Sequence, residues 1–584
     1  MPGNHNYQGH QLPTYPEHDS GNTATGIVTP ASDRMPDLMS IPPKRVLPII
    51  FLPGIMGSNL RLKVDRQKKL QHDNNIAWRP DNKREMEKLI NAGARVRQLQ
   101  LDPDATEVDE YDPVNNITGD KHENSDQRNE NVEVKYPYSL DVSINTPLLM
   151  DDPMTNKPRK TKEQKARERG WGEVYFKSYR EVLERCELHL NTAFHRGVLD
   201  VWWKQIVDVD PAQWQASPQS VLKPLDEKTL KEVVKGCWFP VHAMGYNWLQ
   251  SNSDSSLYIA KRITALMARY EAQGFTCEKV IVVTHSMGGL VARALVHPDM
   301  GNLKEKVLGI VYGEMPAIGA AATYKRMRCG FEDNGVLRGP FESTSAKVMG
   351  NLGEEVTAVL ANSPGALQLL PSNEYGNGWL QVKHKDHTLK LLPQKGDPYE
   401  EIYKLKGKWY GLLREEWINP AKDLNGGFVR TARYLDQAKE FHKAIANTYH
   451  EPSYGHYGAD PEYKTWDHVV WEIDAMAIVP DVETLAIATD NKKGTLQLHG
   501  KGAITRKGRE VSDDINVTLQ SASEPGDQTV PLHSADQQRL LSHKFKGIFR
   551  QTGYDHQGSY QNEKALNSTL YCVVRIAQTM TWNT

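Results

Sequence analysis

The sequence predicts an α/β protein with a mostly parallel sheet that helices cover on both faces. Short runs of apolar, β-branched residues alternate along the chain with segments of helical periodicity. The runs at residues 46–52, 279–284 and 307–312 are apolar almost throughout, as strands buried on both faces are. Residues 255–270 and 287–296, which lie beside these runs, have helical spacing. Repeated strand–helix–strand units of this kind build a parallel sheet.

Further segments complete the predicted core. Residues 172–190 have helical spacing, and residues 240–248 predict a strand and its exit. Two late strands are predicted at residues 518–523 and 546–552, and each ends in a loop that carries polar side chains. A terminal helix is predicted at residues 562–579.

The regions outside this core differ from it in composition. Residues 1–43 are rich in Pro, Gly, Ser and Asp and lack periodicity, which predicts a flexible N-terminal arm. Residues 63–170 are highly charged, and residues 320–515 hold many aromatic and turn residues. We expect these two regions to be large insertions, cap 1 and cap 2. The core then consists of residues 44–62, 171–319 and 516–584.

Composition excludes several classes of protein. The chain holds 71 basic and 73 acidic residues, a balance that argues against a nucleic-acid partner. Its 5 cysteines are scattered and form no CxxC pair, so we expect neither a metal site nor a disulfide framework. The polar N-terminus lacks the apolar stretch of a signal peptide, and no long apolar run could span a membrane. We therefore expect synthesis in the cytoplasm, and export only by a route that needs no signal peptide.

The sequence THSMGG at residues 284–289 lies directly between a predicted strand and a predicted helix. This is the setting of the nucleophile elbow of the α/β-hydrolase fold, in which a serine takes a strained backbone conformation and needs small neighbours such as Gly288. Thr284 occupies the place of the first glycine of the G-x-S-x-G pattern. We predict Ser286 as the nucleophile rather than as a simple helix cap, because a cap does not require the flanking glycines.

Serine needs a base, and the base needs an orienting acid. In this fold the acid and then the histidine follow the serine along the chain. Asp527 lies in the loop after one late strand, and His556 lies in the loop after the next. We predict Asp527 as the acid and His556 as the base. The alternatives are His450, His456 and His533 for the base and Asp397 for the acid.

An oxyanion hole needs two backbone N–H donors. One donor should be Met287, the residue after the nucleophile. The other should come from the loop after the first strand, PGIMGS at residues 53–58, where we choose Ile55 and place Met56 second. The alternative is that this loop is a plain tight turn.

Residues 48–60, PIIFLPGIMGSNL, resemble the opening of the lecithin:cholesterol acyltransferase-like and GPI inositol-deacylase-like lipases. With the long caps and YDHQGSY at residues 554–560, the chain is most similar to the bacterial type VI secretion lipase effectors of that class. The resemblance covers roughly residues 44–584. The other shared motifs follow in order at residues 244–248, 283–290, 363–371 and 526–531.

The resemblance implies an antibacterial phospholipase, secreted by the type VI system into the periplasm of target cells. Its partners would be membrane phospholipid, a cognate immunity protein and a component of the secretion spike. With the predicted Ser–Asp–His triad, we expect hydrolysis of acyl esters through an acyl-enzyme, of phospholipase A1 type, without a cofactor.

Two alternatives to this function stay open. The chain could be an acyltransferase or an esterase of soluble substrates, or a binding or toxin-carrier protein on an inactive hydrolase scaffold. Apolar residues of cap 2 could line an acyl-chain pocket, or they could form the cap's own core. These residues are Leu367, Leu369, Leu370, Trp379 and Leu380.

Overall fold

A parallel sheet of six strands runs through the centre of the molecule. The computed structural model describes residues 14–16, 22–27, 36–41, 43–114, 123–135, 160–195, 197–331, 348–474, 481–500, 514–540 and 544–583. Within them the order of strands in this sheet is β12-β5-β13-β14-β17-β24, and every neighbouring pair is parallel. The strands are β5 (Ile49–Leu52), β12 (Val241–Ala243), β13 (Val280–His285), β14 (Val307–Gly313), β17 (Ser453–Gly458) and β24 (Phe545–Gln551). The predicted parallel architecture is confirmed.

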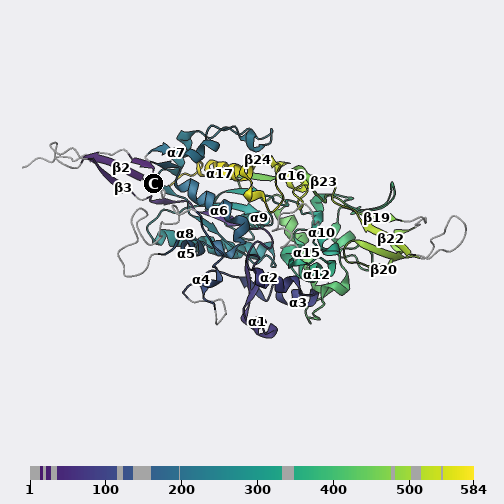
Figure 1. Cartoon of the computed structure of the whole chain (residues 1–584). Helices are drawn as coiled ribbons and strands as arrows, with labels where there is room; N and C mark the ends of the chain where they lie inside the picture. The colour runs from purple at the N-terminus through teal and green to yellow at the C-terminus, as the bar shows by residue number, and fades with distance from the viewer. Residues whose placement is uncertain are drawn as a thin grey trace, which may run out of the picture.

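Helices cover both faces of this sheet, and the strand sequences show why. Along β5, Ile50 and Leu52 point into one apolar core, whereas Ile49 and Phe51 point into the other. This alternation follows from the two-residue period of a strand, so an apolar run needs cover on both sides. One core holds α8 (Asn252–Ala272) and α9 (Gly288–Val296), and the other holds α6 (Phe176–Asn191) and α17 (Glu563–Ala577) (Figure 1).

Two strands differ from the prediction. Residues 453–458, which we assigned to cap 2, form β17 of the central sheet. The sequence SYGHYG contains no apolar run, and its burial comes from the neighbouring strands rather than from its own composition. The prediction of a core strand at residues 518–523 is wrong. That region overlaps β22 (Asp514–Leu519), in which buried Ile515 and Val517 alternate with exposed residues, as in a strand with one buried face.

Strand β22 belongs to a second sheet of six strands, in the order β16-β15-β19-β22-β21-β20. This sheet lies at one end of the molecule, and the N-terminal strands lie at the other (Figure 1). Its other strands are β15 (Leu380–His384), β16 (His387–Leu392), β19 (Val469–Asp474), β20 (Ala486–Asp490) and β21 (Thr495–His499).

The N-terminal region holds three strands where we expected a flexible arm. β1 (Thr14–Pro16), β2 (Asn22–Ile27) and β3 (Pro36–Ile41) form an antiparallel sheet. The rest of that region up to residue 42 lies outside the described residues. The short polar strands pair with one another, a contact that apolar periodicity does not reveal.

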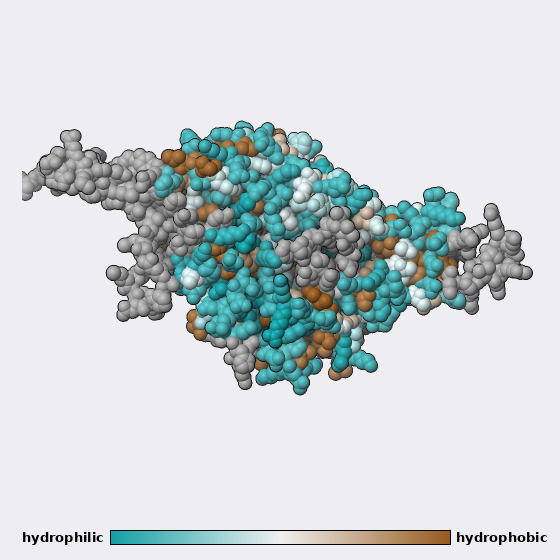
Figure 2. Space-filling model, viewed as in Figure 1, coloured by the Kyte–Doolittle hydropathy of each residue, from teal (hydrophilic) through white to brown (hydrophobic). Residues whose placement is uncertain are grey.

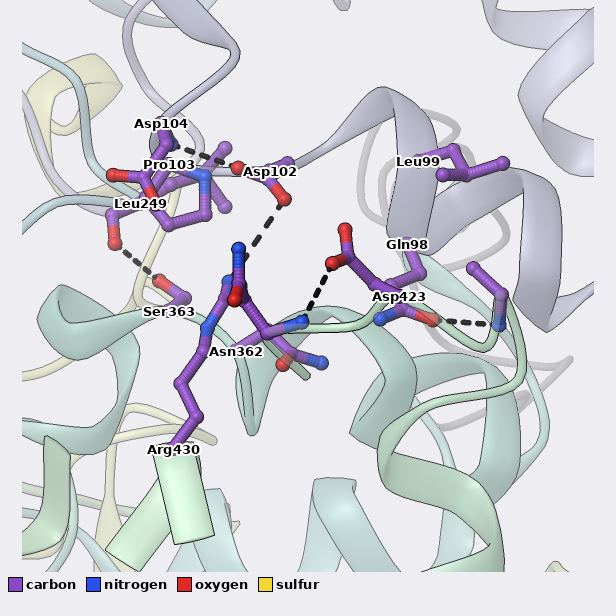
Figure 3. Close-up of polar contacts among 12 residues, drawn as sticks. Gln98, Leu99, Asp102, Pro103, Asp104, Leu249, Asn362, Ser363, Asp423 and Arg430 are labelled. Atoms are coloured by element: carbon purple, nitrogen blue, oxygen red, sulfur yellow. Dashed lines mark hydrogen bonds and ion pairs between the residues drawn. The ribbon is translucent and has the colours of Figure 1, made fainter. Parts of the chain in front are cut away.

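The two insertions touch each other. Arg430 of the second insertion lies 3.8 Å from the carboxylate of Asp102 in the first, as Figure 3 shows. Gln98 donates a hydrogen bond of 2.9 Å to Asn419 and accepts one of 2.9 Å from the N–H of Ala421. Polar contacts therefore connect the two insertions. The boundaries of the two insertions as units remain a prediction.

The remaining elements are mostly short. β6 (Leu60–Leu62) lies directly before the first insertion, which holds α1 (Val64–Leu70), β7 (Ile76–Trp78), α2 (Lys83–Ile90), α3 (Ala94–Gln100), β8 (Thr106–Val108), α4 (Ser125–Arg128) and α5 (Lys162–Glu168). The later part of the chain adds α10 (Ala321–Cys329), α12 (Gly353–Leu360), α13 (Pro364–Leu367), α14 (Glu415–Ile418), α15 (Phe428–Ile445), β18 (Asp460–Thr465), β23 (Glu524–Gly526) and α16 (Leu532–Leu540). Outside the insertions lie β4 (Arg45–Val46), β9 (Phe194–His195), β10 (Val198–Leu199), α7 (Glu227–Val234) and β11 (Cys237–Trp238).

The surface in Figure 2 is largely hydrophilic, and apolar residues form small separate groups on it. Within the part of the chain that the structure describes, no helix is both long enough and apolar enough to cross a bilayer.

Candidate active site

Ser286 lies in a sharp turn between β13 and α9. Its φ is +52°, a left-handed conformation that is strained for a residue other than glycine. Its N–H donates a hydrogen bond of 2.8 Å to the carbonyl of Gly313 in the neighbouring strand. A Cβ atom at Gly288 would lie 2.5 Å from the carbonyl oxygen of Leu52, so only glycine fits there. The strained turn that we predicted around Ser286 is confirmed.

The structure brings Ser286, His556 and Asp527 together. The Nε2 atom of His556 lies 2.8 Å from the Oγ atom of Ser286. Its Nδ1 atom lies 2.6 Å from the Oδ2 atom of Asp527. The backbone N–H of His556 also donates a hydrogen bond of 2.8 Å to the carbonyl of Asp527, so the two loops are joined through their main chains as well.

The carboxylate of Asp527 is held by several donors. Its Oδ1 atom accepts hydrogen bonds from the N–H groups of Thr529 at 2.9 Å and Val530 at 2.6 Å. Burial acts to raise the pKa of Asp527, but the nearby charge of His556 and these hydrogen bonds outweigh it, so the pKa lies below its usual value. Asp527 is therefore ionised at neutral pH and can orient the imidazole.

Asp527 reaches the site by a long excursion of the chain. After β17 the chain leaves the core through β18, passes through strands of the second sheet and returns through β23. Asp460 of β18 pairs with Gly526 of β23 in an antiparallel ladder, which places Asp527 next to the end of β17. The N–H of Gly553 donates a hydrogen bond of 2.7 Å to Asp460, so the loop that carries His556 is held at the same point.

The four alternative residues do not line the cavity in front of Ser286, as far as the described residues show. Each of these side chains lies near a polar group outside that cavity wall. The nearest polar partners are Asp467 for His533, the carbonyl of Lys304 for His450, Glu314 for His456 and Lys439 for Asp397.

The loop after β5 lies against Ser286. A Cβ atom at Gly54 would lie only 2.9 Å from the Cβ of Ser286, so this loop approaches Ser286 as closely as a backbone can. No described residue accepts a hydrogen bond from the N–H groups of Ile55, Met56 or Met287. These three N–H groups are therefore available as the donors that we expect of an oxyanion hole.

Sequence reasoning missed a hydrogen-bonded chain behind the site. The N–H of Gly54 donates to the hydroxyl of Tyr179 at 3.2 Å, and that hydroxyl lies 3.1 Å from Nδ1 of His285. The Nε2 atom of His285 lies 2.8 Å from the carbonyl of His556. Burial lowers the pKa of His285 to about 3, so the ring is neutral and can donate at Nε2 while accepting at Nδ1. These hydrogen bonds thus connect the loop after β5, the turn of Ser286 and the loop that carries His556.

Only part of this series of hydrogen-bonded residues could have been predicted from the sequence. His285 is visible there, because it precedes the serine of the elbow motif. Tyr179 belongs to a helical pattern that predicts a core residue and nothing more.

A cavity of about 120 Å³ opens in front of Ser286. Cap 2 contributes Thr323, Phe331 and Leu369 to its wall. Leu369 is thus the one residue of the expected acyl pocket among the described lining residues. Leu367, Leu370, Trp379 and Leu380 are buried in the apolar core instead. These four residues therefore fit the alternative that they form the core of the cap.

The same cavity wall carries Arg326, the only lysine, arginine or carboxylate among its described residues. The guanidinium donates a hydrogen bond of 2.9 Å to the hydroxyl of Thr529 and lies over the ring of Phe331 at 5.0 Å. The cavity therefore combines apolar walls with one fixed positive charge.

Glu314, Asp527 and His556 each place one ligand atom within 4.8 Å of the others, so the described residues include one group that could hold a metal ion. Both nitrogens of His556 are already hydrogen-bonded, to Asp527 and Ser286. A metal ion at this place would have to replace the bond between His556 and Asp527. The geometry therefore fits proton transfer better than metal ligation.

Comparison with known proteins supports the α/β-hydrolase fold. Residues 246–334 match the family model described as the PGAP1-like alpha/beta domain. The chain is also similar to a solved structure described as the crystal structure of the Tle4-Tli4 complex. The similarity has a TM-score of 0.70 and 30% sequence identity, over 92% of this chain and 99% of that chain. No curated protein is matched by the sequence.

Proposed function

Because this chain belongs to the family of Tle4, the type VI secretion lipase effectors, and has an α/β-hydrolase fold, we propose that it is a serine phospholipase that cleaves acyl esters of glycerophospholipids. The observation that carries the proposal is the pair of short contacts from His556, at 2.8 Å to Ser286 and 2.6 Å to Asp527. These are the contacts that a serine nucleophile, its base and an orienting acid require.

In the proposed mechanism, Oγ of Ser286 attacks the ester carbonyl while Nε2 of His556 takes the hydroxyl proton. Asp527 stabilises the imidazolium that forms and keeps Nδ1 protonated. His556 then protonates the leaving alcohol, and an acyl-enzyme on Ser286 remains. Water enters, gives its proton to His556 and attacks the acyl carbonyl, which releases the fatty acid and restores the serine.

The oxyanion of each tetrahedral intermediate would bind to the N–H groups of Met287 and Ile55. Both belong to backbone segments in contact with Ser286, and neither N–H has another described acceptor. Donors that are already oriented stabilise developing charge without reorganising during the reaction.

The test of this function is product analysis on phospholipids that carry a different acyl chain at each glycerol position. We expect fatty acid from the sn-1 position and the matching lysophospholipid, as from a phospholipase A1. An added alcohol should not become a major acyl acceptor; formation of its ester as the main product would favour the acyltransferase alternative. If only soluble short-chain esters were cleaved, the phospholipid substrate would be wrong.

Arg326 supports a substrate with a phosphate group, because arginine is well suited to binding phosphate oxygens. We expect Arg326→Gln to lower kcat/KM on a phospholipid by about tenfold or more, since hydrogen bonds to charged groups contribute about 1.5–3 kcal/mol. Hydrolysis of an uncharged diacylglycerol ester of the same chain length should fall much less. Both rates are measured in the same mixed micelles.

A matched control for this change is Arg414→Gln, which removes a guanidinium paired with Asp490 at 3.1 Å, outside the described wall of the cavity. Its activity should equal that of the wild type on both lipids. An equal loss on both lipids in Arg326→Gln would mean that the guanidinium only supports the loop of Thr529.

The biological role also follows from the family and is part of the proposal. The related structure is a complex of Tle4 with Tli4. We propose that this chain likewise has a cognate immunity protein, that a spike component of the type VI system carries it into the periplasm of target cells, and that it acts there as an antibacterial toxin.

A further inference from the structure

Glu314 is a buried carboxyl group beside the acid of the site. It follows β14 directly and has no exposed surface. Its φ is +51°, a conformation that costs about 1–3 kcal/mol for a residue other than glycine. Its N–H donates a hydrogen bond of 3.0 Å to the carbonyl of His456. A strained backbone and a fully buried carboxyl at the same glutamate indicate a specific role for its side chain.

The groups around this carboxyl are polar but carry no positive charge. Its Oε2 atom accepts a hydrogen bond of 2.8 Å from the N–H of Gly458, and an oxygen of the carboxyl lies within 4.8 Å of a carboxyl oxygen of Asp527. The hydroxyl of Tyr554 lies near this carboxyl but donates its hydrogen bond of 2.9 Å to Gln551, and Nδ1 of His456 lies 3.3 Å from Oε1. Burial lowers the pKa of His456 to about 3, so that ring is neutral. No described lysine or arginine lies within ion-pair distance of Glu314.

Two buried carboxyl groups this close together favour a state with one proton between them, because two buried charges of the same sign repel. Asp527 receives donors from His556 and from two backbone N–H groups, all of which favour its charged form. Glu314 receives one backbone donor. Burial, together with the adjacent charge of Asp527, raises the pKa of Glu314 well above its usual value. The proton therefore resides on Glu314.

We propose that Glu314 is a positioning residue of the active site, which stays protonated and donates its carboxyl proton in a hydrogen bond to Asp527. This inference rests on the proposed role of Asp527 in orienting His556. The added donor holds the side chain of Asp527 together with the backbone N–H groups of Thr529 and Val530. It also gives a role to Oε1, a buried atom that has no other hydrogen-bond partner among the described residues.

Glutamine and alanine substitutions separate this role from its alternatives. In Glu314→Gln, the amide N–H₂ can donate to Asp527 while its oxygen still accepts from Gly458, and no charge is lost. We expect kcat on a soluble short-chain ester to stay within about threefold of the wild type, and the acid limb of the pH profile of kcat/KM to stay in place. Glu314→Ala lacks the donor, so kcat should fall about tenfold or more at nearly unchanged KM. Its acid limb should move to higher pH, because Asp527 then attracts the proton of His556 more strongly.

The protonation state can be observed without activity. The infrared difference spectrum between wild type and Glu314→Gln at neutral pH should contain the carbonyl band of a protonated carboxylic acid. This measurement decides the question even if Glu314→Ala does not fold.

The proposal is overturned by any of three results. Glu314→Gln could lose activity as severely as Asp527→Asn, which would make Glu314 the charged acid. Glu314→Ala could fold with wild-type activity and pH profile, which would leave the carboxyl without a role. The acid band could be missing from the difference spectrum. A failure of the proposed function looks different, since the wild type itself would then neither hydrolyse esters nor react with a fluorophosphonate probe.

Discussion

Replacing Ser286 by alanine should abolish ester hydrolysis while leaving the fold intact. We expect kcat to fall by about 10⁴–10⁶-fold, because removal of the nucleophile of a triad leaves only the contribution of the oxyanion hole and of substrate binding. Stability should change little. Serine and alanine both have a Cβ and suffer the same strain at φ +52°, and the side chain lost is one hydroxyl bonded to His556. The measurements are kcat on a soluble ester, fluorophosphonate labelling and the thermal midpoint.

A suitable control for this variant is Ser256→Ala, which also removes a buried hydroxyl. Ser256 donates a hydrogen bond of 2.7 Å to the carbonyl of Ser253 within α8, away from the cavity. It should keep wild-type kcat and react with the probe. If Ser286→Ala retained more than about a tenth of the activity, a serine mechanism at this residue would be refuted.

The sequence was sufficient to predict the strands and loops that form the proposed site. The strands β5, β13 and β14 are apolar because both of their faces are buried, so their signal is strong and local. The residues expected to act lie in the loops directly after such strands, and small or turn-forming residues mark these loops. Ser286 follows β13, and the oxyanion loop follows β5.

The sequence was insufficient where burial depends on distant parts of the chain. β17 is a buried strand of glycine, tyrosine, serine and histidine, and its place in the sheet is set by β14 and β24 on either side. The strand expected before Asp527 was misplaced for the same reason. Asp527 is positioned by the pairing of β18 with β23, two strands that lie far apart in the sequence.

Glu314 is an intermediate case. It is a charged residue immediately after an apolar central strand, and this placement alone could have marked it as a candidate. Its proximity to Asp527, however, depends on the pairing of β18 with β23, which the sequence does not reveal.

Substitutions of the base and the acid should differ in a way that the hydrogen bonds dictate. His556→Ala should match Ser286→Ala, and the double variant should be no slower than either single one, because the residues act as a unit. Asp527→Asn should cost about 10⁴-fold in kcat. The N–H groups of Thr529 and Val530 hold the Oδ1 position, so the new amide nitrogen faces Nδ1 of His556. It would donate there and force the ring proton onto Nε2.

An imidazole protonated at Nε2 presents a donor to Ser286, 2.8 Å away, and cannot accept its proton. The loss in Asp527→Asn should therefore appear in kcat, with KM for a soluble ester nearly unchanged. His450→Ala is the matched control, because His450 contacts the carbonyl of Lys304 at 3.3 Å and does not line the cavity. Loss of turnover in His450→Ala together with an active His556→Ala would require that the base be sought in another part of the chain. The order of severity among the three variants thus tests the orientation of the ring as well as the identity of the residues.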